Sequence, residues 1–387
     1  MVFSFEVPTK VFFGWGEIKK IGKLVKGYGK KSFVVIDPFL KSSIGEEIKK
    51  YLEIEGIEAV FFDKIVSNPT YELIDEGALI AKKENCRVII GIGGGSTIDT
   101  AKGISVVLGN GGSSWNYVFR TDHEVKEPKN VFPVIAVPTT AGTGSEVTLY
   151  SVITNPHIKE KSTIIHSSIY PKVALVDPSL TLTVPSYLTA TTGFDAFAHA
   201  MEAYISKKSN PFSDMIALEA IRRIFRYLPT AVVNGDNITA RVNVAYGATL
   251  AGIAISQAGT ALPHAVGQAI GGRYNAPHGE TLAICFLQIM KNSYLGAPEK
   301  FATFLDVVDE KYPGFSVRQK AEKSVEVIER FIEDIGLKNI KLTKYGVSKQ
   351  DLPKIVESIL KGYKQDVDVH PRRFTKDDLM TLLTQLI

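Results

Sequence analysis

Cysteine is almost absent from this chain: only Cys86 and Cys285 occur among its 387 residues. The two lie far apart and form no CxxC motif. A disulfide framework or a paired-thiol redox motif is therefore not expected, and a reduced, cytoplasmic protein is the natural interpretation. We expect both thiols to be small buried hydrophobic groups rather than nucleophiles.

Long apolar runs and a dominant charge sign are also missing. No segment approaches the roughly 18 consecutive apolar residues of a membrane helix. The opening MVFSFEVPTK lacks the charged and apolar regions of a signal peptide. The net charge of +4 is small, and lysines and glutamates are interspersed. We therefore expect neither a membrane nor a nucleic-acid partner, but a globular protein that binds a small molecule.

The order of apolar patterns indicates two domains. Short apolar runs at 32–37, 59–62, 87–92 and 133–137 are separated by segments with helical spacing. Strands separated in this way pair in parallel with right-handed crossovers. Beyond about Pro185, strand-like runs nearly vanish and helical periodicity dominates. We predict an α/β domain with a parallel sheet over 1–184 and an all-α domain over 185–387.

A glycine-rich turn between the third predicted strand and the next helix indicates phosphate binding. Its residues 93–96 read GGGS. Small residues let backbone N–H groups approach a phosphate, and the helix N-terminus adds partial positive charge. The Rossmann pattern is incomplete because Ser96 replaces the third glycine. A tight structural turn is the alternative. Asp99 and Lys102, on the following helix, either face the cofactor or are solvated.

A second polar loop strengthens the case for a nucleotide. Residues 138–146, PTTAGTGSE, follow the fourth predicted strand and offer three threonine hydroxyls, one serine hydroxyl and two glycines. Such a loop can bond ribose, pyrophosphate or an amide. In an open parallel sheet, ligands bind beyond the carboxyl ends of the strands, where both loops are expected.

Asp37, at the end of the first predicted strand, indicates which dinucleotide is bound. An acid at this place can accept hydrogen bonds from ribose hydroxyls and would repel the extra phosphate of NADP. At ~4 Å and an effective dielectric constant of ~20, two like unit charges cost about 4 kcal/mol. The position favours NAD. The alternative is an Asp-Pro turn residue.

One carboxylate and three histidines form a candidate metal site. Asp195 and His199 stand four apart in a helical segment, so they share one face. That spacing suits two ligands of one metal, and equally an ordinary hydrogen-bonded pair. His264 and His278 have small or apolar neighbours. A carboxylate with three imidazoles suits iron, zinc or nickel, and does not suit calcium or magnesium.

These motifs, in this order, resemble those of the iron-containing (group III) alcohol dehydrogenases over nearly the whole chain. The opening VPTKVFFGWG is similar to the start of that family, and GGGSTIDTAK to its phosphate loop. PTTAGTGSEVT is similar to its nicotinamide and ribose loop. GFDAFAHAMEAY and the two later histidine segments are similar to its metal-binding core.

The resemblance implies a dehydroquinate synthase-like fold, with the active site between a dinucleotide-binding α/β domain and a helical metal-binding domain. It implies a homodimer with NAD and Fe²⁺. Zinc binds nitrogen and oxygen ligands more tightly than iron, so the isolated protein can carry Zn²⁺ instead. The implied metal ligands, catalytic through the metal, are Asp195, His199, His264 and His278. The implied dinucleotide contacts are Gly94, Gly95, Ser96, Thr139, Thr140, Thr143 and Lys161. Asp37 stands at the position that selects NAD. We also expect Asp99 to contact the dinucleotide, because of its place on the helix after the glycine-rich turn rather than because of the resemblance.

The implied activity is the interconversion of a small alcohol or diol with its aldehyde or ketone by hydride transfer. Three alternatives stay open: a glycerol dehydrogenase-type zinc enzyme, a dehydroquinate synthase-type lyase, and a nucleotide- and metal-binding protein without turnover. One departure concerns proton transfer. Many family members carry a histidine four residues after the third ligand, where this chain has Gln268. Glutamine cannot relay a proton near neutral pH, so ribose hydroxyls and water would have to substitute.

Overall fold

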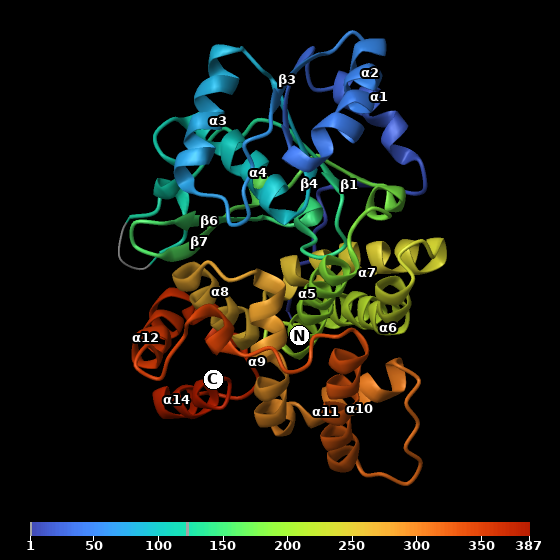
Figure 1. Cartoon of the computed structure of the whole chain (residues 1–387), viewed down its shortest axis with the longest axis vertical. Helices are drawn as coiled ribbons and strands as arrows, with labels where there is room; N and C mark the ends of the chain where they lie inside the picture. Colours follow the sequence, from blue (N-terminus) through green and yellow to red (C-terminus); the bar gives the residue numbers. More distant parts are fainter. Residues whose placement is uncertain (1, 121–123) are drawn as a thin grey trace. The chain divides into compact units, whose positions relative to one another are not determined.

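The structure is a computed structural model that describes residues 2–120 and 124–387 (Figure 1). The chain forms two compact units. One spans Val7–Thr183, and the other comprises Val184–Ile387 together with the N-terminal residues up to Glu6. Each unit is described by itself below.

The first unit is built on a parallel sheet with the strand order β1-β8-β5-β4-β2-β3. Its strands are β1 (Lys10–Phe13), β2 (Lys31–Ile36), β3 (Glu58–Phe62), β4 (Val88–Gly93), β5 (Val134–Pro138) and β8 (Val173–Val176). The four predicted strands correspond to β2, β3, β4 and β5. The strand order reverses between β2 and β4, since β3 lies on one side of β2 and the later strands on the other. Open sheets of this kind bind ligands at such a reversal.

Helices cover both faces of this sheet. They are α1 (Ile21–Lys26), α2 (Glu46–Ile54), α3 (Tyr71–Lys83) and α4 (Gly95–Asn110). Phe33 of β2 belongs to the same apolar cluster as Ile104 of α4. The next residue, Val34, belongs to a second cluster with Ile21 of α1 and Ile48 of α2. Burial of both faces explains why the central strands are continuously apolar rather than alternating.

An antiparallel hairpin, β6 (Tyr150–Asn155) and β7 (Glu160–Ile165), completes the first unit. Sequence analysis predicted neither this hairpin nor the short strands β1 and β8. The hairpin strands mix polar with apolar residues, and β1 and β8 have four residues each. Such segments carry a weak periodic signal, and their pairing with distant strands decides their structure.

In the described residues, the regular secondary structure of the second unit is entirely helical. Its helices are α5 (Ser186–Ile205), α6 (Pro211–Val233), α7 (Ile238–Ala258), α8 (Leu262–Tyr274), α9 (His278–Ser293), α10 (Pro298–Val307), α11 (Val317–Asp334), α12 (Leu352–Gly362), α13 (Lys364–Val369) and α14 (Lys376–Thr384). Phe197 of α5 is central to an aromatic core, with Phe286 of α9 and Phe331 of α11 around it. The predicted fold class, an α/β unit with a parallel sheet followed by an all-α unit, is confirmed.

The N-terminal residues belong with the helices rather than with the sheet. Phe5 stacks on Phe212 of α6, with ring centroids 5.3 Å apart. The backbone N–H of Glu6 donates to the Gln257 side chain, and the Gln257 amide donates back to the Glu6 carbonyl. These contacts fasten the start of the chain to α6 and α7.

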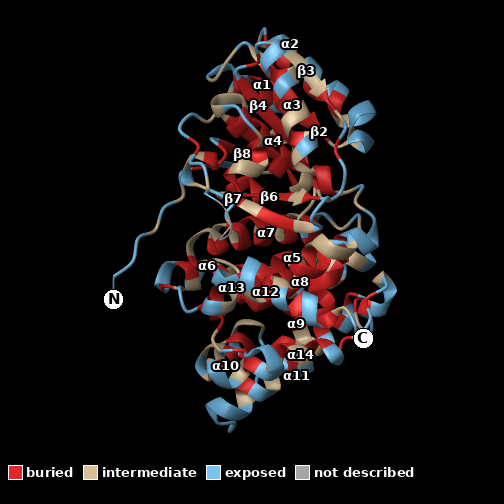
Figure 2. Ribbon diagram, turned by 90° about the vertical axis from the view of Figure 1, so that its left-hand side faces the viewer, coloured by how far each residue is buried: buried red, intermediate tan, exposed pale blue. Residues whose placement is uncertain are grey.

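Within the described residues, α7 is the one helix long and apolar enough to cross a membrane by length and composition. The core helix of a folded unit meets the same criteria. In this structure α7 packs against α5 and α6, and 61% of its apolar window is buried inside the protein. Its buried Arg241 donates to Thr189 and to the Gly235 carbonyl. Figure 2 shows α7 among the buried central helices.

Candidate functional site

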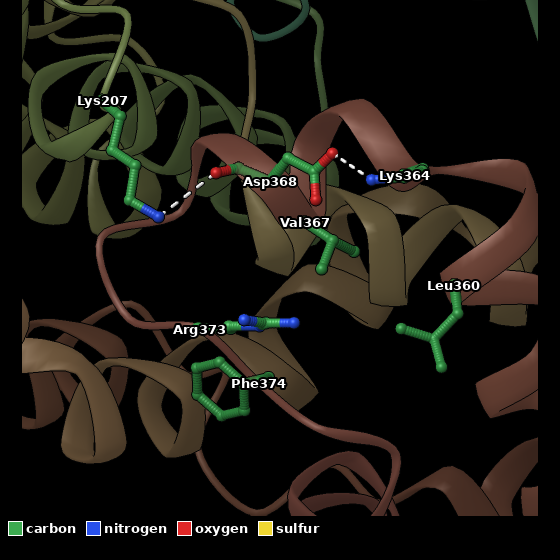
Figure 3. Close-up of a pocket in the computed structure, with 7 residues that line it drawn as sticks. All are labelled: Lys207, Leu360, Lys364, Val367, Asp368, Arg373 and Phe374. Carbon is green, nitrogen blue, oxygen red and sulfur yellow. Dashed lines mark hydrogen bonds and ion pairs between the residues drawn. The ribbon is translucent and has the colours of Figure 1, made fainter.

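A surface pocket of ≈ 290 Å³ lies in the helical unit, around α12, α13 and the segment after α13 (Figure 3). Its lining residues are Lys207, Leu360, Lys364, Val367, Asp368, Arg373 and Phe374. The Lys364 ammonium pairs with the Asp368 carboxylate, and Lys207 donates to the Asp368 carbonyl. None of the site residues predicted from the sequence lines this pocket, so the candidate chemistry lies elsewhere.

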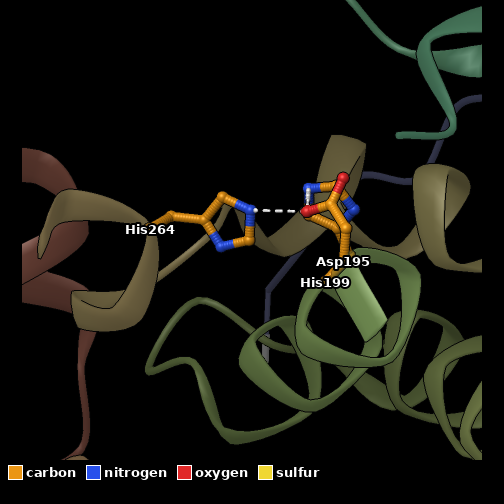
Figure 4. Close-up of side chains that lie close together, drawn as sticks. All are labelled: Asp195, His199 and His264. Carbon is orange, nitrogen blue, oxygen red and sulfur yellow. Dashed lines mark ion pairs between the residues drawn. The ribbon is translucent and has the colours of Figure 1, made fainter. Parts of the chain in front are cut away.

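The four predicted metal ligands lie together in the helical unit. Asp195 and His199 project from α5, His264 from α8 and His278 from the start of α9. Asp195 Oδ1 lies 3.7 Å from Nε2 of His199, and 3.5 Å from Nε2 of both His264 and His278. Figure 4 shows Asp195, His199 and His264 directed toward one another. Ligands bound to one ion at about 2.1 Å lie about 3.4 Å apart in a tetrahedron, which matches these separations.

The interior of this cluster is buried and incompletely hydrogen-bonded. Asp195 is 3% exposed and His264 is 2% exposed. Asp195 Oδ1 and His264 Nε2 have no hydrogen-bond partner among the described residues. A buried polar atom without a partner costs about 1–3 kcal/mol. A divalent ion between them would satisfy both atoms, and the donor set is the one that iron, zinc or nickel prefers. The residues therefore fit a metal ion.

Glu202 completes the cluster and was missed by sequence analysis. This fully buried carboxylate of α5 lies 2.6 Å from His264 Nδ1 through Oε1. Its Oε2 accepts from the backbone N–H groups of Ala261 and His264. The contact keeps a proton on Nδ1 and directs Nε2 toward Asp195. Asp195, His199 and Glu202 share one helix face by their spacing, and this signal was available in the sequence.

The electrostatics of the cluster favour a cation. Burial alone would raise the pKa of Asp195, but His199 and His278 hold it well below its usual range. Burial raises the pKa of Glu202. Burial would lower the pKa of His264, yet Glu202 and Asp195 raise it to about 10. The buried carboxylates of Asp195 and Glu202 thus hold positive charge among the histidines, and a bound divalent ion would take the place of that charge.

The predicted dinucleotide residues share one edge of the sheet. Strands β2, β4 and β5 are neighbours, with Ile36 opposite Ile92 and Gly93 opposite Pro138. The Asp37 N–H donates to the Ile92 carbonyl and the Thr139 N–H to the Gly93 carbonyl. Asp37 and both polar loops therefore lie side by side at the carboxyl ends of three adjacent strands.

The two loops approach each other closely, and Gly95 leaves no room for a Cβ. A Cβ on Gly95 would lie 2.5 Å from the Thr143 methyl, and one on Gly94 would lie 3.3 Å from Thr140 Oγ1. Gly93 has a φ of +157° and no room for a Cβ beside Thr97. At the N-terminus of α4, no side-chain cap occupies the first turn in the described structure. A helix N-terminus without a side-chain cap fits a phosphate.

Three other predicted cofactor residues already hold protein contacts. Both Asp99 oxygens accept hydrogen bonds, from the Ser145 hydroxyl at 2.5 Å and the Val152 N–H at 3.0 Å. Asp37 Oδ1 accepts from the Phe39 N–H and caps the following turn, as the Asp-Pro alternative predicts. Lys161 of β7 is buried and its Nζ donates to the Asn68 side chain.

Lys102 and Asp99 of α4 both contact the Ser145 hydroxyl in the second loop. Lys102 is fully buried, and its Nζ donates to the Ser145 hydroxyl, the Thr148 hydroxyl and the carbonyls of Thr148 and Tyr150. Burial lowers the pKa of Lys102 to about 8 and raises that of Asp99. The pair ties α4 to the chain that follows the second loop.

The comparisons with known proteins agree along the whole chain. Residues 8–178 match the family described as iron-containing alcohol dehydrogenase, and residues 189–387 match the C-terminal region of the same family. The chain is 35% identical to the NAD-dependent methanol dehydrogenase of Bacillus methanolicus, covering 98% of both chains. It is 36% identical to the 1,3-propanediol dehydrogenase of Klebsiella pneumoniae, covering 99% of this chain and 98% of that one. A crystal structure of 1,3-propanediol oxidoreductase superposes with a TM-score of 0.94 at 35% identity over all of both chains.

Proposed function

The chain belongs to the iron-containing alcohol dehydrogenase family, and from this premise we propose that Asp195, His199, His264 and His278 hold the metal at which it works. The enzyme is an NAD-linked oxidoreductase that acts on CH–OH groups. We propose that it interconverts a small alcohol or diol with its aldehyde or ketone. The observation that carries the metal assignment is the convergence of three imidazole nitrogens on Asp195 Oδ1 without a hydrogen bond to that atom from the described residues.

The protein's part in this chemistry is to hold and orient. When bound, a divalent ion supplies Lewis acidity that lowers the pKa of an alcohol, and NAD supplies the hydride acceptor. Asp195 contributes a buried negative charge that favours a cation over an empty site. Glu202 fixes the tautomer of His264, so that Nε2 is directed toward Asp195. The partly exposed side chain of His278 marks the side of the cluster that a substrate can reach.

The sheet-bearing unit is proposed as the dinucleotide-binding domain and the helical unit as the metal-binding domain. Contacts to the dinucleotide are assigned to Asp37, Gly94, Gly95, Ser96, Thr139, Thr140, Thr143 and Lys161. The bare first turn of α4 and the closely packed loops support the phosphate contacts. Asp99 acts as an anchor of this edge rather than as a contact, because both of its oxygens are engaged by the protein.

A homodimer in the cytoplasm is proposed for the assembled enzyme. In the described structure β1 is an edge strand that pairs with β8 alone, and such an edge can be covered by a second copy. Cys86 and Cys285 are both free and buried, which suits a reducing compartment.

The direct test is anaerobic reconstitution with ferrous iron, followed by NADH formation with short primary alcohols, diols and glycerol. Turnover with simple alcohols or diols, lost on chelation, is expected. Turnover with glycerol alone in the zinc-loaded protein would favour a glycerol dehydrogenase-type enzyme instead. No turnover in either direction, with metal and NAD bound, would contradict the proposal.

A further inference from the structure

His278 is held differently from the other three proposed ligands. It is the first residue of α9, and its side chain is 29% exposed, whereas those of Asp195, His199 and His264 are almost fully buried. Pro277 precedes it and supplies no side-chain cap to the helix in the described structure. The direction of His278 therefore depends on how the first turn of α9 is fixed by its neighbours.

Glu280, two residues further on, fastens this turn. Its carboxylate is buried, and Oε2 accepts hydrogen bonds from the Lys344 ammonium and the Tyr345 hydroxyl. Both donors come from the 3₁₀ turn η9 (Leu342–Tyr345), far along the chain. The Lys344 Nζ also lies 5.9 Å from the ring centroid of Tyr187, which belongs to α5. The Glu280–Lys344 pair thus links the start of α9 to η9 and to the helix that carries Asp195.

Gly279, between His278 and Glu280, shows how closely this turn approaches α5. A Cβ at Gly279 would lie 2.4 Å from the Thr191 carbonyl oxygen. Thr191 stands one turn before Asp195 on the same helix. The backbone of α9 therefore lies directly against the backbone of α5, and the Glu280 contacts hold it there.

We propose that Glu280, Lys344 and Tyr345 are positioning residues that hold His278 toward Asp195 and so set the metal affinity of the site. This inference rests on the proposed function, since it assigns His278 to a metal. The Lys344 side chain is 51% exposed. The Glu280 carboxylate is buried, so the loss of a donor also weakens folding. A positioning role predicts, in addition, a loss of metal affinity in the folded protein that the change in folding stability does not explain.

The test compares the full-length Lys344→Met and Tyr345→Phe proteins with wild type. Lys361→Met is the matched control, because Lys361 pairs with Glu357 on the exposed face of α12. Co²⁺ is the probe: its dissociation constant is measured by chelator competition, and its visible absorption reports the ligand geometry. Urea unfolding of the metal-free proteins measures folding separately.

We expect Co²⁺ to bind about 10-fold more weakly to each variant, as for residues that orient metal ligands, and not to the control. The visible spectrum should shift toward that of His278→Gln, and the loss of affinity should exceed any part explained by the change in metal-free unfolding. Lys344→Arg should restore part of the affinity. Unchanged Co²⁺ affinity in both variants, or a loss that simply tracks metal-free stability, would overturn the inference. Absence of Co²⁺ binding in wild type would instead overturn the proposed function, and the inference with it.

Discussion

Asp99 and Asp195 are both buried carboxylates on helices, but the protein satisfies them to opposite extents. In the sheet-bearing unit, both oxygens of Asp99 accept hydrogen bonds, and Lys102 nearby has four partners of its own. In the helical unit, Asp195 Oδ1 faces three imidazole nitrogens with no hydrogen bond from the described residues. Satisfied buried charges anchor a fold, whereas converging unsatisfied atoms mark a place for a ligand.

The largest effect is expected from removing the unsatisfied carboxylate. In Asp195→Ala, metal content and turnover should fall together, with turnover down by about 10³-fold or more, because the bound ion contributes several kcal/mol to the barrier. Unfolding of the metal-free variant shows how much of the change comes from the lost ion pairs of Asp195 with the histidines rather than from the lost metal. Metal analysis, steady-state rates and urea unfolding check this. Asp334→Ala, an exposed carboxylate of α11, is the control. Full activity in a metal-free Asp195→Ala protein would contradict the metal assignment.

For the buried pair Asp99 and Lys102, we expect a loss of folding stability without a loss of metal binding. Lys102→Met leaves Asp99 buried without its cation, so unfolding of the sheet-bearing unit should become easier by about 3–5 kcal/mol. Affinity of the helical unit for metal should not change. Urea unfolding of the metal-free protein, with Co²⁺ titration beside it, separates the two outcomes.

A double variant provides the control for this prediction. Asp99→Asn combined with Lys102→Met removes both charges, so part of the lost stability should return. Weaker metal binding with unchanged unfolding would contradict the distinction between anchor and site.

The sequence could locate both carboxylates but could not tell them apart. Asp99 with Lys102 and Asp195 with His199 each show an acid and a base about one helical turn apart. The partners that decide the difference, Ser145 and Val152 for Asp99, stand more than forty residues away in the chain. Local spacing carries no information about such contacts, because they depend on how the second loop and β6 pack on α4.

In both units, elements with a strong local pattern were predictable from the sequence, whereas features that depend on distant contacts were not. Strands β2, β4 and β5 lie inside the sheet and are almost wholly buried, so their apolar runs are strong. The hairpin β6–β7 has a mixed pattern and a register fixed by pairing alone. In the helical unit, Glu202 shares the helix face of Asp195 and His199, but its role depends on α8 lying opposite, which no local pattern indicates.

A smaller effect on metal binding is expected from changing Glu202, the carboxylate that contacts His264 Nδ1. Glu202→Gln keeps the size of the side chain but removes the charge that orients His264, so metal should bind about 10–100-fold more weakly. Chelator competition measures this. Glu219→Gln on α6, which pairs with surface arginines, is the matched control. Equal affinity in wild type and Glu202→Gln would show that His264 is oriented by packing alone.

The smallest effect concerns a second buried histidine that contrasts with His264. Burial lowers the pKa of His370 to about 3, with Lys207 and Arg372 adding to the shift, and its Nε2 lies 2.8 Å from the Ser293 hydroxyl. The unfolded chain takes up a proton below about pH 6.5, whereas folded His370 stays neutral to about pH 3, so stability falls with acidification across that window. Between pH 7 and pH 5.5 this contribution amounts to about 1.3 kcal/mol. His370→Gln should lose that increment, so urea unfolding of the metal-free variant should depend less on pH than that of wild type. The charges around His264 are the same in both proteins and cancel in the comparison; an identical pH dependence would therefore mean that His370 gains a proton without unfolding.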